Sequence, residues 1–362
     1  MSMSDENNFD KRLLKWYERT KRDLPWRNTR DPYRIWLSEI ILQQTRVEQG
    51  LPYYRRFTEN YPTVHDLANA PEDEVMKLWE GLGYYSRARN LHSSAKLVSS
   101  TMSGAFPDSS EQLQELKGIG PYTANAIASF AFDEDVAVVD GNVHRVLSRI
   151  FNVSTPVNST KGKAEFQALA NKLLPTGHSA EFNQAMMEFG ALQCKPAPDC
   201  TICPFAEMCK AKAQDKISEL PVKERKQAKK MRYLNYLMIH NGERTLLQKR
   251  TNKDIWQNLH EFLLHESSSD PAGIEELITN IKPLQGPITS DFSIDDRWSS
   301  KHILSHQILH VNVWIARSPQ ASLGSSNDGI FEASLDDVVN KYALPVVLKR
   351  FVEEKYKDIV SQ

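Results

Sequence analysis

The sequence predicts two domains of different fold class, a large all-α region followed by a smaller α+β domain. From residue 9 to about 213, apolar residues recur at three- and four-residue spacing between Gly and Pro turns, which is typical of packed helices. After about residue 232 the segments become extended, and two of them flank Asn241-Gly242, a pair that favours a type I′ hairpin. A chain of 362 residues is also too long for one ordinary core.

The C-terminal part adds further elements and a candidate boundary. Residues 302–316, HILSHQILHVNVWIA, predict another long strand, and residues 345–360 predict a closing helix. Residues 223–232, KERKQAKKMR, are strongly basic and nearly free of core-forming side chains, which favours a solvated linker.

The composition is that of a globular protein without a membrane segment. The net charge is −1, and no apolar run approaches the roughly 18 residues that a membrane span requires. The N-terminal MSMSDENNFDKR is polar and acidic, unlike a signal or transit peptide. We therefore expect a reducing, cytoplasmic location, in which clustered cysteines indicate a metal rather than disulfides.

A glycine turn between two predicted helices is a candidate phosphate site. In LQELKGIGPYTANAIASFAF, a helix is expected to end at Leu116 and another to begin near Thr123, with Gly118 and Gly120 between them. Backbone N–H groups exposed there could bind a DNA phosphate, although a plain αα-hairpin explains the segment equally well.

Glu39 is a candidate general acid. It lies in DPYRIWLSEIILQQTRVEQ, where apolar residues cover most of the predicted helix. A carboxylate in such surroundings must be paired or desolvated, and desolvation raises its pKa toward the range that a general acid requires. The residues alone favour the alternative, a salt bridge to Arg34 or Arg46.

Asp140 is a candidate second carboxylate. It follows the apolar run VAVV and precedes a helix expected to begin near Gly141. The ordinary interpretation is a helix N-cap. The functional one is a carboxylate held ionised by helix N–H groups, facing a protonated Glu39 across a pocket.

All the cysteines of the chain fall within sixteen residues, with the spacing C-x5-C-x2-C-x5-C. Structural zinc usually takes two close pairs of ligands, whereas this arrangement has one close pair and two outlying cysteines, which favours an iron–sulfur cluster over zinc or disulfides. The predicted ligands of this 4Fe-4S cluster are Cys194, Cys200, Cys203 and Cys209.

The motifs in their order resemble the helix-hairpin-helix DNA glycosylases: LKGIG, VVDGNVHRV, then FNQAMMEFGALQC leading into the cysteine loop. Within that superfamily, LPWR, WLSEIILQQT and GLGYYSRARNLH look like the adenine DNA glycosylases of the MutY type. The resemblance is dense over residues 9–213 and weaker beyond. It implies a base-excision repair enzyme that flips adenine, mispaired with 8-oxoguanine or guanine in duplex DNA, into a pocket and removes it.

The resemblance also implies domain limits. These are a helical glycosylase region at 1–215 (a six-helix module at about 29–137 and an iron–sulfur module from about 1–28 and 138–215), a basic linker at 216–232 and a Nudix-like domain at 233–362.

The catalytic roles follow position by position. Glu39 matches the glutamate that protonates adenine, Asp140 the aspartate that stabilises the oxocarbenium-like sugar, and Asn142 an asparagine near the sugar. Tyr122 occupies the site where bifunctional relatives carry a lysine nucleophile. Because a phenol cannot form a Schiff base, the resemblance implies base removal without strand cleavage.

Two further sets match binding positions of the family. The adenine-pocket set is Arg22, Trp26, Arg27, Gln184 and Glu188. The DNA- and lesion-binding set is Gln43, Gln44, Tyr84, Gly118 and Gly120, among which Gln44 and Tyr84 match residues that wedge into the base stack.

The C-terminal domain resembles the Nudix-like module that inspects 8-oxoguanine. Its LLQKRTNKDIWQNLHEF lacks the hydrolase box, which implies recognition rather than hydrolysis. The family's Phe-Ser-His loop corresponds to Leu304-Ser305-His306, in which Ser305 and His306 retain hydrogen-bonding groups. His302, His306 and His310 would share one face of a single strand, which raises a metal site there as a minor alternative.

In this family the cluster is structural and supports a DNA-facing loop, on which Lys195, Lys210 and Lys212 could touch phosphates. One departure is the first cysteine spacing, which is five residues here and commonly six in the family. We expect a monomer on duplex DNA, cytoplasmic and associated with the nucleoid.

Three alternatives stay open at this point. They are a glycosylase for another base, a non-catalytic iron–sulfur protein that binds damaged DNA, and a zinc-stabilised protein-interaction module. The presence of both Glu39 and Asp140 argues against a pure binding protein.

Overall fold

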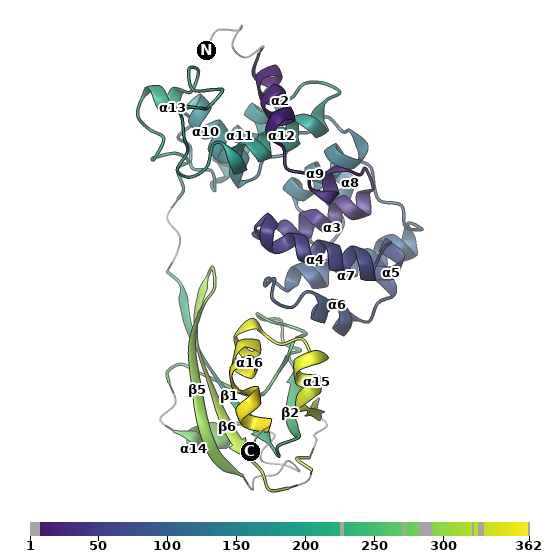
Figure 1. Ribbon diagram of the computed structural model, residues 1–362, viewed down its shortest axis with the longest axis vertical. Coiled ribbons are helices and arrows are strands. Elements are labelled where there is room, and N and C mark those ends of the chain that lie inside the picture. The colour runs from purple at the N-terminus through teal and green to yellow at the C-terminus, as the bar shows by residue number, and fades with distance from the viewer. Residues whose placement is uncertain are drawn as a thin grey trace. The chain divides into compact units, whose positions relative to one another are not determined.

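The computed structural model describes residues 8–224, 228–270, 273–281, 292–320, 322–324 and 329–360 (Figure 1). The chain forms two compact units, Met1–Ala68 with Ser93–Lys226, and Asn69–His92 with Gln227–Gln362. The first is helical and the second contains a sheet, so the predicted fold classes are confirmed. Residues 225–227 of the predicted linker lie outside the described residues, and the first strand already begins at Lys230.

The elements before the sheet are α2 Phe9–Thr20, η1 Pro25–Arg27, α3 Pro32–Leu42, α4 Val47–Asn60, α5 Val64–Asn69, α6 Glu72–Leu78, α7 Ser86–Thr101, α8 Ser110–Leu113, α9 Pro121–Phe132, α10 Gly141–Phe151, α11 Thr160–Leu173, α12 Ser179–Leu192 and α13 Lys210–Ala213. Those that follow are β1 Lys230–His240, β2 Arg244–Lys249, β3 His260–Glu261, β4 Leu263–Ser267, α14 Ile274–Asn280, β5 Ser293–Ile303, β6 Gln307–Arg317, β7 Ile330–Ser334, α15 Leu335–Asn340 and α16 Val346–Val360.

The helix α3 begins where its sequence dictates. The Asp31 side chain accepts the backbone N–H of Tyr33, and Pro32 occupies the first helical position, where a missing N–H costs nothing. Its apolar residues are buried on nearly all sides, as the sequence predicts. The helix therefore lies inside the unit and can hold a polar side chain away from water.

An aromatic cluster joins α2, α12 and the cysteine loop. The Phe9 and Phe205 ring centroids lie 4.7 Å apart, and Phe189 meets Phe205 edge-on at 5.1 Å. All three side chains are buried. Because such rings contribute large apolar areas and specific geometry, this cluster fixes α2 against the loop near residue 205.

The predicted glycine turn lies between α8 and α9. Gly118 has φ +83°, which a residue with a Cβ rarely adopts, and Gly120 is the extended N-cap of α9. The helix begins at Pro121, two residues before the expected Thr123.

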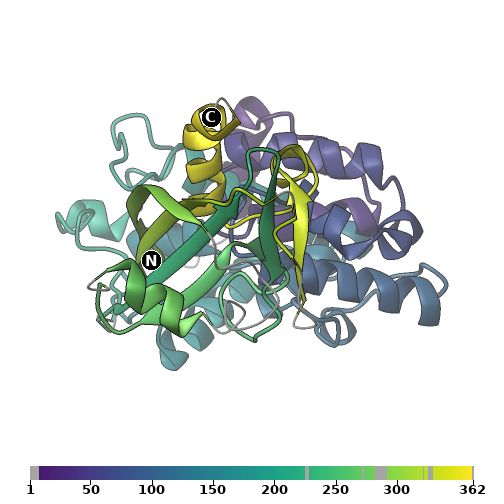
Figure 2. The same cartoon turned by 90° about the horizontal axis from the view of Figure 1, so that it is seen from below.

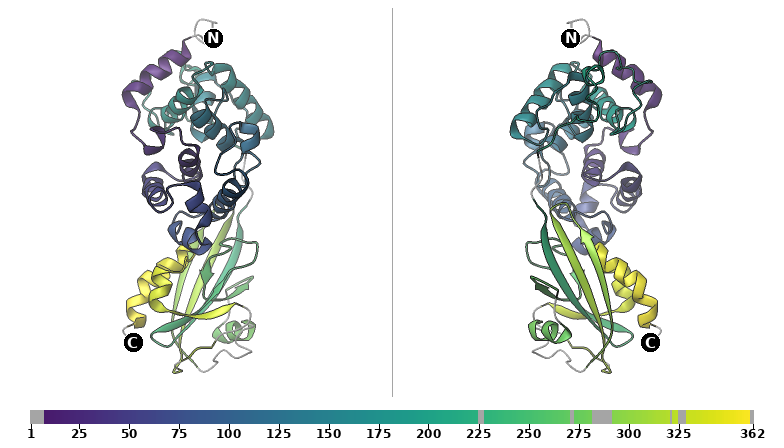
Figure 3. Two further views of the ribbon diagram at one scale, coloured as in Figure 1. Left: turned by 90° about the vertical axis from the view of Figure 1, so that its right-hand side faces the viewer. Right: turned by 90° about the vertical axis from the view of Figure 1, so that its left-hand side faces the viewer.

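The second unit is built on a seven-stranded mixed sheet with the main order β3-β2-β1-β6-β5, with β4 paired to β1 and β7 to β2. The strands β1 and β6 run parallel, and β5 and β6 form an antiparallel hairpin. Figures 2 and 3 show α16 on one face of the sheet and α14 on the other. Side chains of β1 alternate accordingly, so Leu237 and Ile239 join the core that contains Leu277 of α14.

Two details of the predicted strands are wrong. The β1–β2 hairpin exists, but Gly242 is the positive-φ residue of its turn (φ +94°) and Asn241 is not, which excludes type I′. Residues 302–316 are not one strand, because a turn at 304–306 separates β5 from β6.

The prediction that three histidines share one face of a single strand is therefore wrong as well. His302 lies on β5, His306 in the turn and His310 on β6. His302 pairs with Leu309, whereas His310 pairs with Lys301, so these two histidines point to opposite faces of the sheet.

No helix within the described ranges has the length and apolarity needed to cross a bilayer.

Candidate active site

Glu39 is buried in the C-terminal half of α3 and forms a hydrogen bond with Tyr122 of α9. The Tyr122 hydroxyl donates to Oε2 at 2.9 Å. Burial, aided by the negative charge of Asp140, raises the pKa of Glu39 to about 7, although the Tyr122 bond and Arg27 oppose the rise. The predicted salt bridge is wrong, because Arg34 pairs with Asp31 at 3.6 Å and no ion pair of Glu39 occurs among the described residues. The desolvated carboxyl is suited to proton donation near neutral pH.

Asp140 caps α10 and is also in electrostatic contact with Glu39. Its Oδ1 accepts the backbone N–H of Val143 at 2.7 Å, and its Oδ2 accepts the Asn142 side-chain amide at 2.7 Å. Burial raises the pKa of Asp140, and these donors act against the rise by stabilising the charged form. The Asp140 carboxylate thus caps α10 and also lies within electrostatic range of Glu39.

Arg145 extends this network, and the sequence analysis missed it. Its Nη2 donates to Asn142 Oδ1 at 2.9 Å and to the Gly190 carbonyl at 2.7 Å, and its Nε donates to the Cys194 carbonyl at 2.7 Å. A Cβ on Gly190 would lie 2.6 Å from the Asn142 Cβ, so glycine is needed there. The only sequence clue was the i+3 spacing from Asn142, which places Arg145 on the same side of α10.

A buried carboxylate joins two arginines of the predicted adenine-pocket set. The Glu188 side chain has no exposed area, and it accepts from Arg22 Nε at 3.0 Å, Arg22 Nη2 at 2.7 Å and Arg27 Nη2 at 2.8 Å. Burial would raise the pKa of Glu188, but the hydrogen bonds from Arg22 and Arg27 lower it to about 2.

The remaining members of that set lie near these arginines. Gln184 Oε1 accepts the Tyr17 hydroxyl at 2.9 Å, and the Arg27 guanidinium lies 5.8 Å from the Tyr17 ring centroid. Trp26 is buried and meets Tyr54 edge-on at 5.1 Å. Through Arg27, whose charge lowers the pKa of Glu39, the set adjoins the acid.

Glu188, Arg22 and Arg27 form what we call the Glu188 cluster. It predicts that the stability of the helical unit falls in acid. Because the pKa of Glu188 is about 2 in the folded state against an ordinary 4.5, the carboxylate contributes about 3 kcal/mol above pH 4.5, lost as the pH falls toward 2. Urea unfolding from pH 6 to 3 should therefore show a decline that is shallower in Glu188→Gln. Asp133→Asn, which removes an exposed ion pair with Arg30, is the matched control and should keep the wild-type slope. Equal slopes in wild type and Glu188→Gln would contradict the assignment.

The two predicted wedge residues, Gln44 and Tyr84, both have left-handed backbone conformations. Gln44 (φ +56°) is exposed just after α3, and Tyr84 (φ +48°) has 45% of its area exposed in the second unit. Non-glycine residues at positive φ are uncommon and are held by their surroundings. Gln43 is the C-cap of α3, and its Nε2 donates to the Thr123 hydroxyl of α9 at 3.0 Å.

Ser305 and His306 are both exposed in the turn between β5 and β6. The Ser305 hydroxyl lies 3.1 Å from His306 Nδ1. The Lys230 N–H donates to the His306 carbonyl at 3.2 Å, and Lys229 Nζ donates to the Leu304 carbonyl at 2.8 Å. The turn thus presents two polar side chains on a braced backbone.

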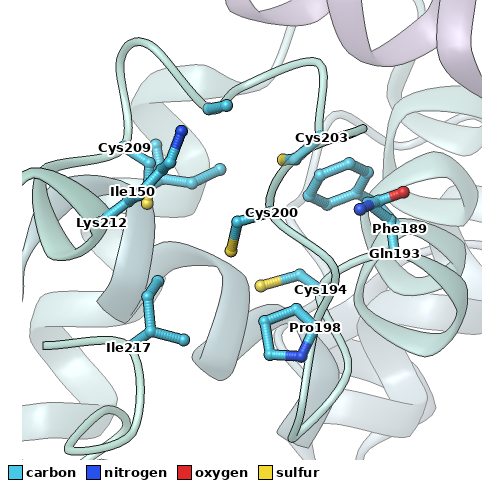
Figure 4. Close-up of a pocket in the computed structure, with 11 residues that line it drawn as sticks. Ile150, Phe189, Gln193, Cys194, Pro198, Cys200, Cys203, Cys209, Lys212 and Ile217 are labelled. Carbon is cyan, nitrogen blue, oxygen red and sulfur yellow. The ribbon is translucent and has the colours of Figure 1, made fainter. Parts of the chain in front are cut away.

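The four cysteines line one pocket and form no disulfide with one another. Figure 4 shows their sulfur atoms gathered around its interior, with Ile150, Phe189 and Ile217 among the other lining residues. Arg149 of α10 donates to Cys194 Sγ at 3.6 Å and to the Lys195 carbonyl at 2.7 Å. Four thiols in a largely apolar pocket, beside a guanidinium that offsets negative charge, fit a thiolate-bound metal cluster.

Two family models and several known proteins match this chain. Residues 37–175 match the HhH-GPD superfamily of base excision DNA repair proteins, and residues 235–354 match the NUDIX domain. An adenine DNA glycosylase of Buchnera aphidicola subsp. Baizongia pistaciae is 34% identical over 329 residues, covering 89% of this chain and 90% of that protein. An adenine DNA glycosylase of Mus musculus is 44% identical over 219 residues, covering 58% of this chain and 42% of that protein.

Solved structures match the helical part. A thermostable thymine-DNA glycosylase is 31% identical with a TM-score of 0.54, covering 58% of this chain and 98% of that one. A non-covalent endonuclease III–DNA complex, at 22% identity and a TM-score of 0.52, covers 59% of this chain and 98% of the other, and shares the fold.

Proposed function

The chain belongs to the adenine DNA glycosylases of base excision repair, and on that premise we propose which of its residues carry out the reaction. The substrate is duplex DNA with adenine opposite 8-oxoguanine or guanine, and the products are free adenine and an abasic site. The observation that carries the proposal is the buried Glu39, whose pKa is about 7 and whose electrostatic neighbour is a second carboxylate, Asp140.

Glu39 is the general acid. Its carboxyl proton passes to a ring nitrogen of the flipped adenine, the glycosidic electron pair leaves with the base, and positive charge develops on the sugar. Water then adds to C1′ and releases a proton. General acid catalysis of this kind contributes about 10²- to 10⁴-fold.

Asp140 stabilises the positive sugar, and Asn142 positions Asp140. The Oδ2 atom of Asp140 accepts from the Asn142 side-chain amide, and the Asn142 side chain in turn accepts from Arg145. The Asp140 carboxylate is therefore oriented before positive charge develops on the sugar. The Glu188 cluster, with Trp26 and Gln184, forms the wall of the adenine pocket. This assignment is supported by Arg27, which bonds Glu188 and whose charge also acts on Glu39.

Tyr122 makes the enzyme monofunctional. Its hydroxyl donates to Glu39 and therefore orients the acid, but a phenol cannot form the Schiff base that β-elimination requires. Strand cleavage should occur only after alkali.

Cys194, Cys200, Cys203 and Cys209 hold a 4Fe-4S cluster, whose contribution is to stabilise the loop structurally. The residues fit such a group, because all four thiols line one pocket and Arg149 donates to the sulfur of Cys194. The Nη1 and Nη2 atoms of Arg149 also fix the carbonyls of Lys195 and Pro196, which braces the loop for contact with phosphates.

The C-terminal domain reads 8-oxoguanine, and Ser305 and His306 supply its hydrogen bonds. Gln44 and Tyr84 enter the base stack beside the lesion, and Gln43 supports this contact. The turn with Gly118 and Gly120 binds a phosphate at the N-terminus of α9. We assign the glycosylase region to about residues 1–215 and the reading domain to about 233–362, acting as a monomer.

The pH dependence of base release tests the acid. Because Glu39 must be protonated, we expect the single-turnover rate to fall about tenfold per pH unit above about 7. The Tyr122 hydrogen bond lowers the pKa of Glu39, so Tyr122→Phe should move the falling limb to higher pH. A profile that is flat between pH 6 and 9 would contradict the assignment.

The cluster predicts a brown protein with an absorption band near 400 nm. Cys203→Ser should weaken the band and lower the melting temperature, because the loop loses a ligand. Thr201→Ala, a neighbour whose hydroxyl donates to Asp199 at 2.6 Å, is the matched control and should keep the band. A colourless protein with one equivalent of zinc would identify the alternative metal.

The experiment for the function itself is a single-turnover assay on a labelled duplex with adenine opposite 8-oxoguanine. Each time point is split, with and without hot alkali. Cleavage only after alkali supports excision without lyase activity. Tight binding without product would favour a damage-binding protein, and cleavage without alkali would point to a lysine nucleophile.

A further inference from the structure

The loop that carries Tyr84, residues 80–85, is built on positive-φ residues. Gly81 has φ +97°, Gly83 +72° and Tyr84 +48°. The buried Trp79 donates its Nε1 hydrogen to the Gly83 carbonyl at 3.1 Å, and Arg87 Nη2 donates to the same carbonyl at 3.2 Å. We call residues 80–85 the Tyr84 loop. It presents an exposed phenol on a backbone that its surroundings must hold in place.

Both ends of the Tyr84 loop are bonded to a single residue of the C-terminal domain. Glu80 Oε1 accepts the Leu344 N–H at 3.0 Å, and the Tyr85 hydroxyl donates to the Leu344 carbonyl at 3.3 Å. Leu344 is buried in the segment between α15 and α16. The loop and this segment belong to the same compact unit, although more than 250 residues separate them in sequence.

Charge fixes the first of these two ends. The Glu80 side chain is only 4% exposed, and its Oε2 lies 3.1 Å from Lys77 Nζ and 2.8 Å from Lys349 Nζ. Lys77 also donates to the carbonyls of Val339 and Tyr342, at 2.8 and 3.0 Å. Because a buried carboxylate without a partner is costly, the two partly exposed lysines stabilise Glu80 in this position.

We propose that Glu80 and Tyr85 are positioning residues that fix the Tyr84 loop to Leu344 of the C-terminal domain. The inference rests on the proposed wedge role of Tyr84. By this inference, the domain that reads 8-oxoguanine also determines the position of the Tyr84 side chain, since the Tyr84 loop and that domain belong to one compact unit. The domain would then act on base excision twice, through the lesion-reading turn and through the wedge.

A double-mutant cycle separates positioning from simple stabilisation. A residue that acts through Tyr84 should have no further effect once the Tyr84 side chain is gone, whereas a general loss of stability should persist. The variants in the full-length enzyme are Glu80→Gln, Tyr85→Phe, Tyr84→Ala and the two doubles with Tyr84→Ala. Tyr85→Phe keeps the buried ring and removes one hydroxyl, so it gives an answer even if Glu80→Gln fails to fold.

The primary measurement is the single-turnover rate on a duplex with adenine opposite 8-oxoguanine. The second uses the same variants in a Glu39→Gln background, with 2-aminopurine next to 8-oxoguanine, whose fluorescence rises when the stack is opened. We expect Glu80→Gln and Tyr85→Phe each to lower the rate about five- to tenfold and to reduce the fluorescence rise. In the Tyr84→Ala background they should add nothing.

Asp73→Asn is the matched control. It removes an exposed ion pair with Lys249, 2.6 Å long, that joins α6 to the same domain without touching the Tyr84 loop, and it should behave as wild type. Additive losses in the doubles, with a normal Tyr84→Ala defect, would overturn the inference alone. A Tyr84→Ala enzyme with wild-type rate and fluorescence would overturn the wedge role and the inference together.

Discussion

The enzyme with Glu39→Gln should fold, bind lesion DNA with wild-type affinity and lose base release by about 10²- to 10⁴-fold. Glutamine keeps the shape of the side chain and can still accept the Tyr122 hydroxyl, now 2.9 Å from Oε2. It cannot donate an acidic proton, however. Removal of the carboxyl also relieves burial of a titratable group, so stability should be unchanged or slightly higher.

The measurement is a single-turnover rate on A:8-oxoguanine duplex, with binding followed in parallel by fluorescence anisotropy. Ser38→Ala is a suitable control on the same helix, because its buried hydroxyl donates to the Ile35 carbonyl of its own helix. A Glu39→Gln enzyme that retains more than about a tenth of the wild-type rate would remove the general acid from the mechanism.

Asp140→Asn should lower base release by about 10²- to 10³-fold with little loss of stability. Asparagine is as good an N-cap as aspartate, so its Oδ1 can keep the bond with the Val143 N–H. The charge that stabilises the positive sugar is lost. Since the charge of Asp140 raises the pKa of Glu39, the falling limb of the pH profile should also move to lower pH.

Asp140→Asn is best judged against Ser159→Asn. Ser159 is also an N-cap, of α11, and accepts the Gly162 N–H at 2.9 Å, so this control exchanges a cap without touching the proposed site. Thermal unfolding should place both variants within a few degrees of wild type. An Asp140→Asn enzyme of normal rate but low melting temperature would reduce Asp140 to a structural cap.

The sequence could single out Glu39, Asp140 and the cysteine loop as candidates because each lies in a local pattern. An apolar helix, a helix start and a compact ligand spacing are properties of a few neighbouring residues. The partners of these groups could not be read in the same way. Tyr122 donates to Glu39 across 83 residues, and Arg22 reaches Glu188 across 166, so only the packing of α3, α9 and α12 reveals them.

Local pattern also misled in places. Glu39 looked salt-bridged because arginines flank it in sequence, but Arg34 pairs with Asp31, Arg46 is the exposed N-cap of α4, and the carboxyl meets a phenol instead. The extended run at 302–316 looked like one strand because turn residues are scarce there. Ile303 pairs with Ile308, which closes a tight hairpin, but its turn contains no glycine or proline from which it could be predicted.

The seating of the Tyr84 loop on Leu344 has a consequence for how the chain is made. Glu80 leaves the ribosome 269 residues before Lys349, a delay of roughly 15–50 s at ordinary elongation rates. For that interval the Glu80 carboxylate lacks its bonds with Leu344 and Lys349. The helical unit must therefore begin to fold before residues 69–92 have gained the C-terminal part of the unit to which they belong.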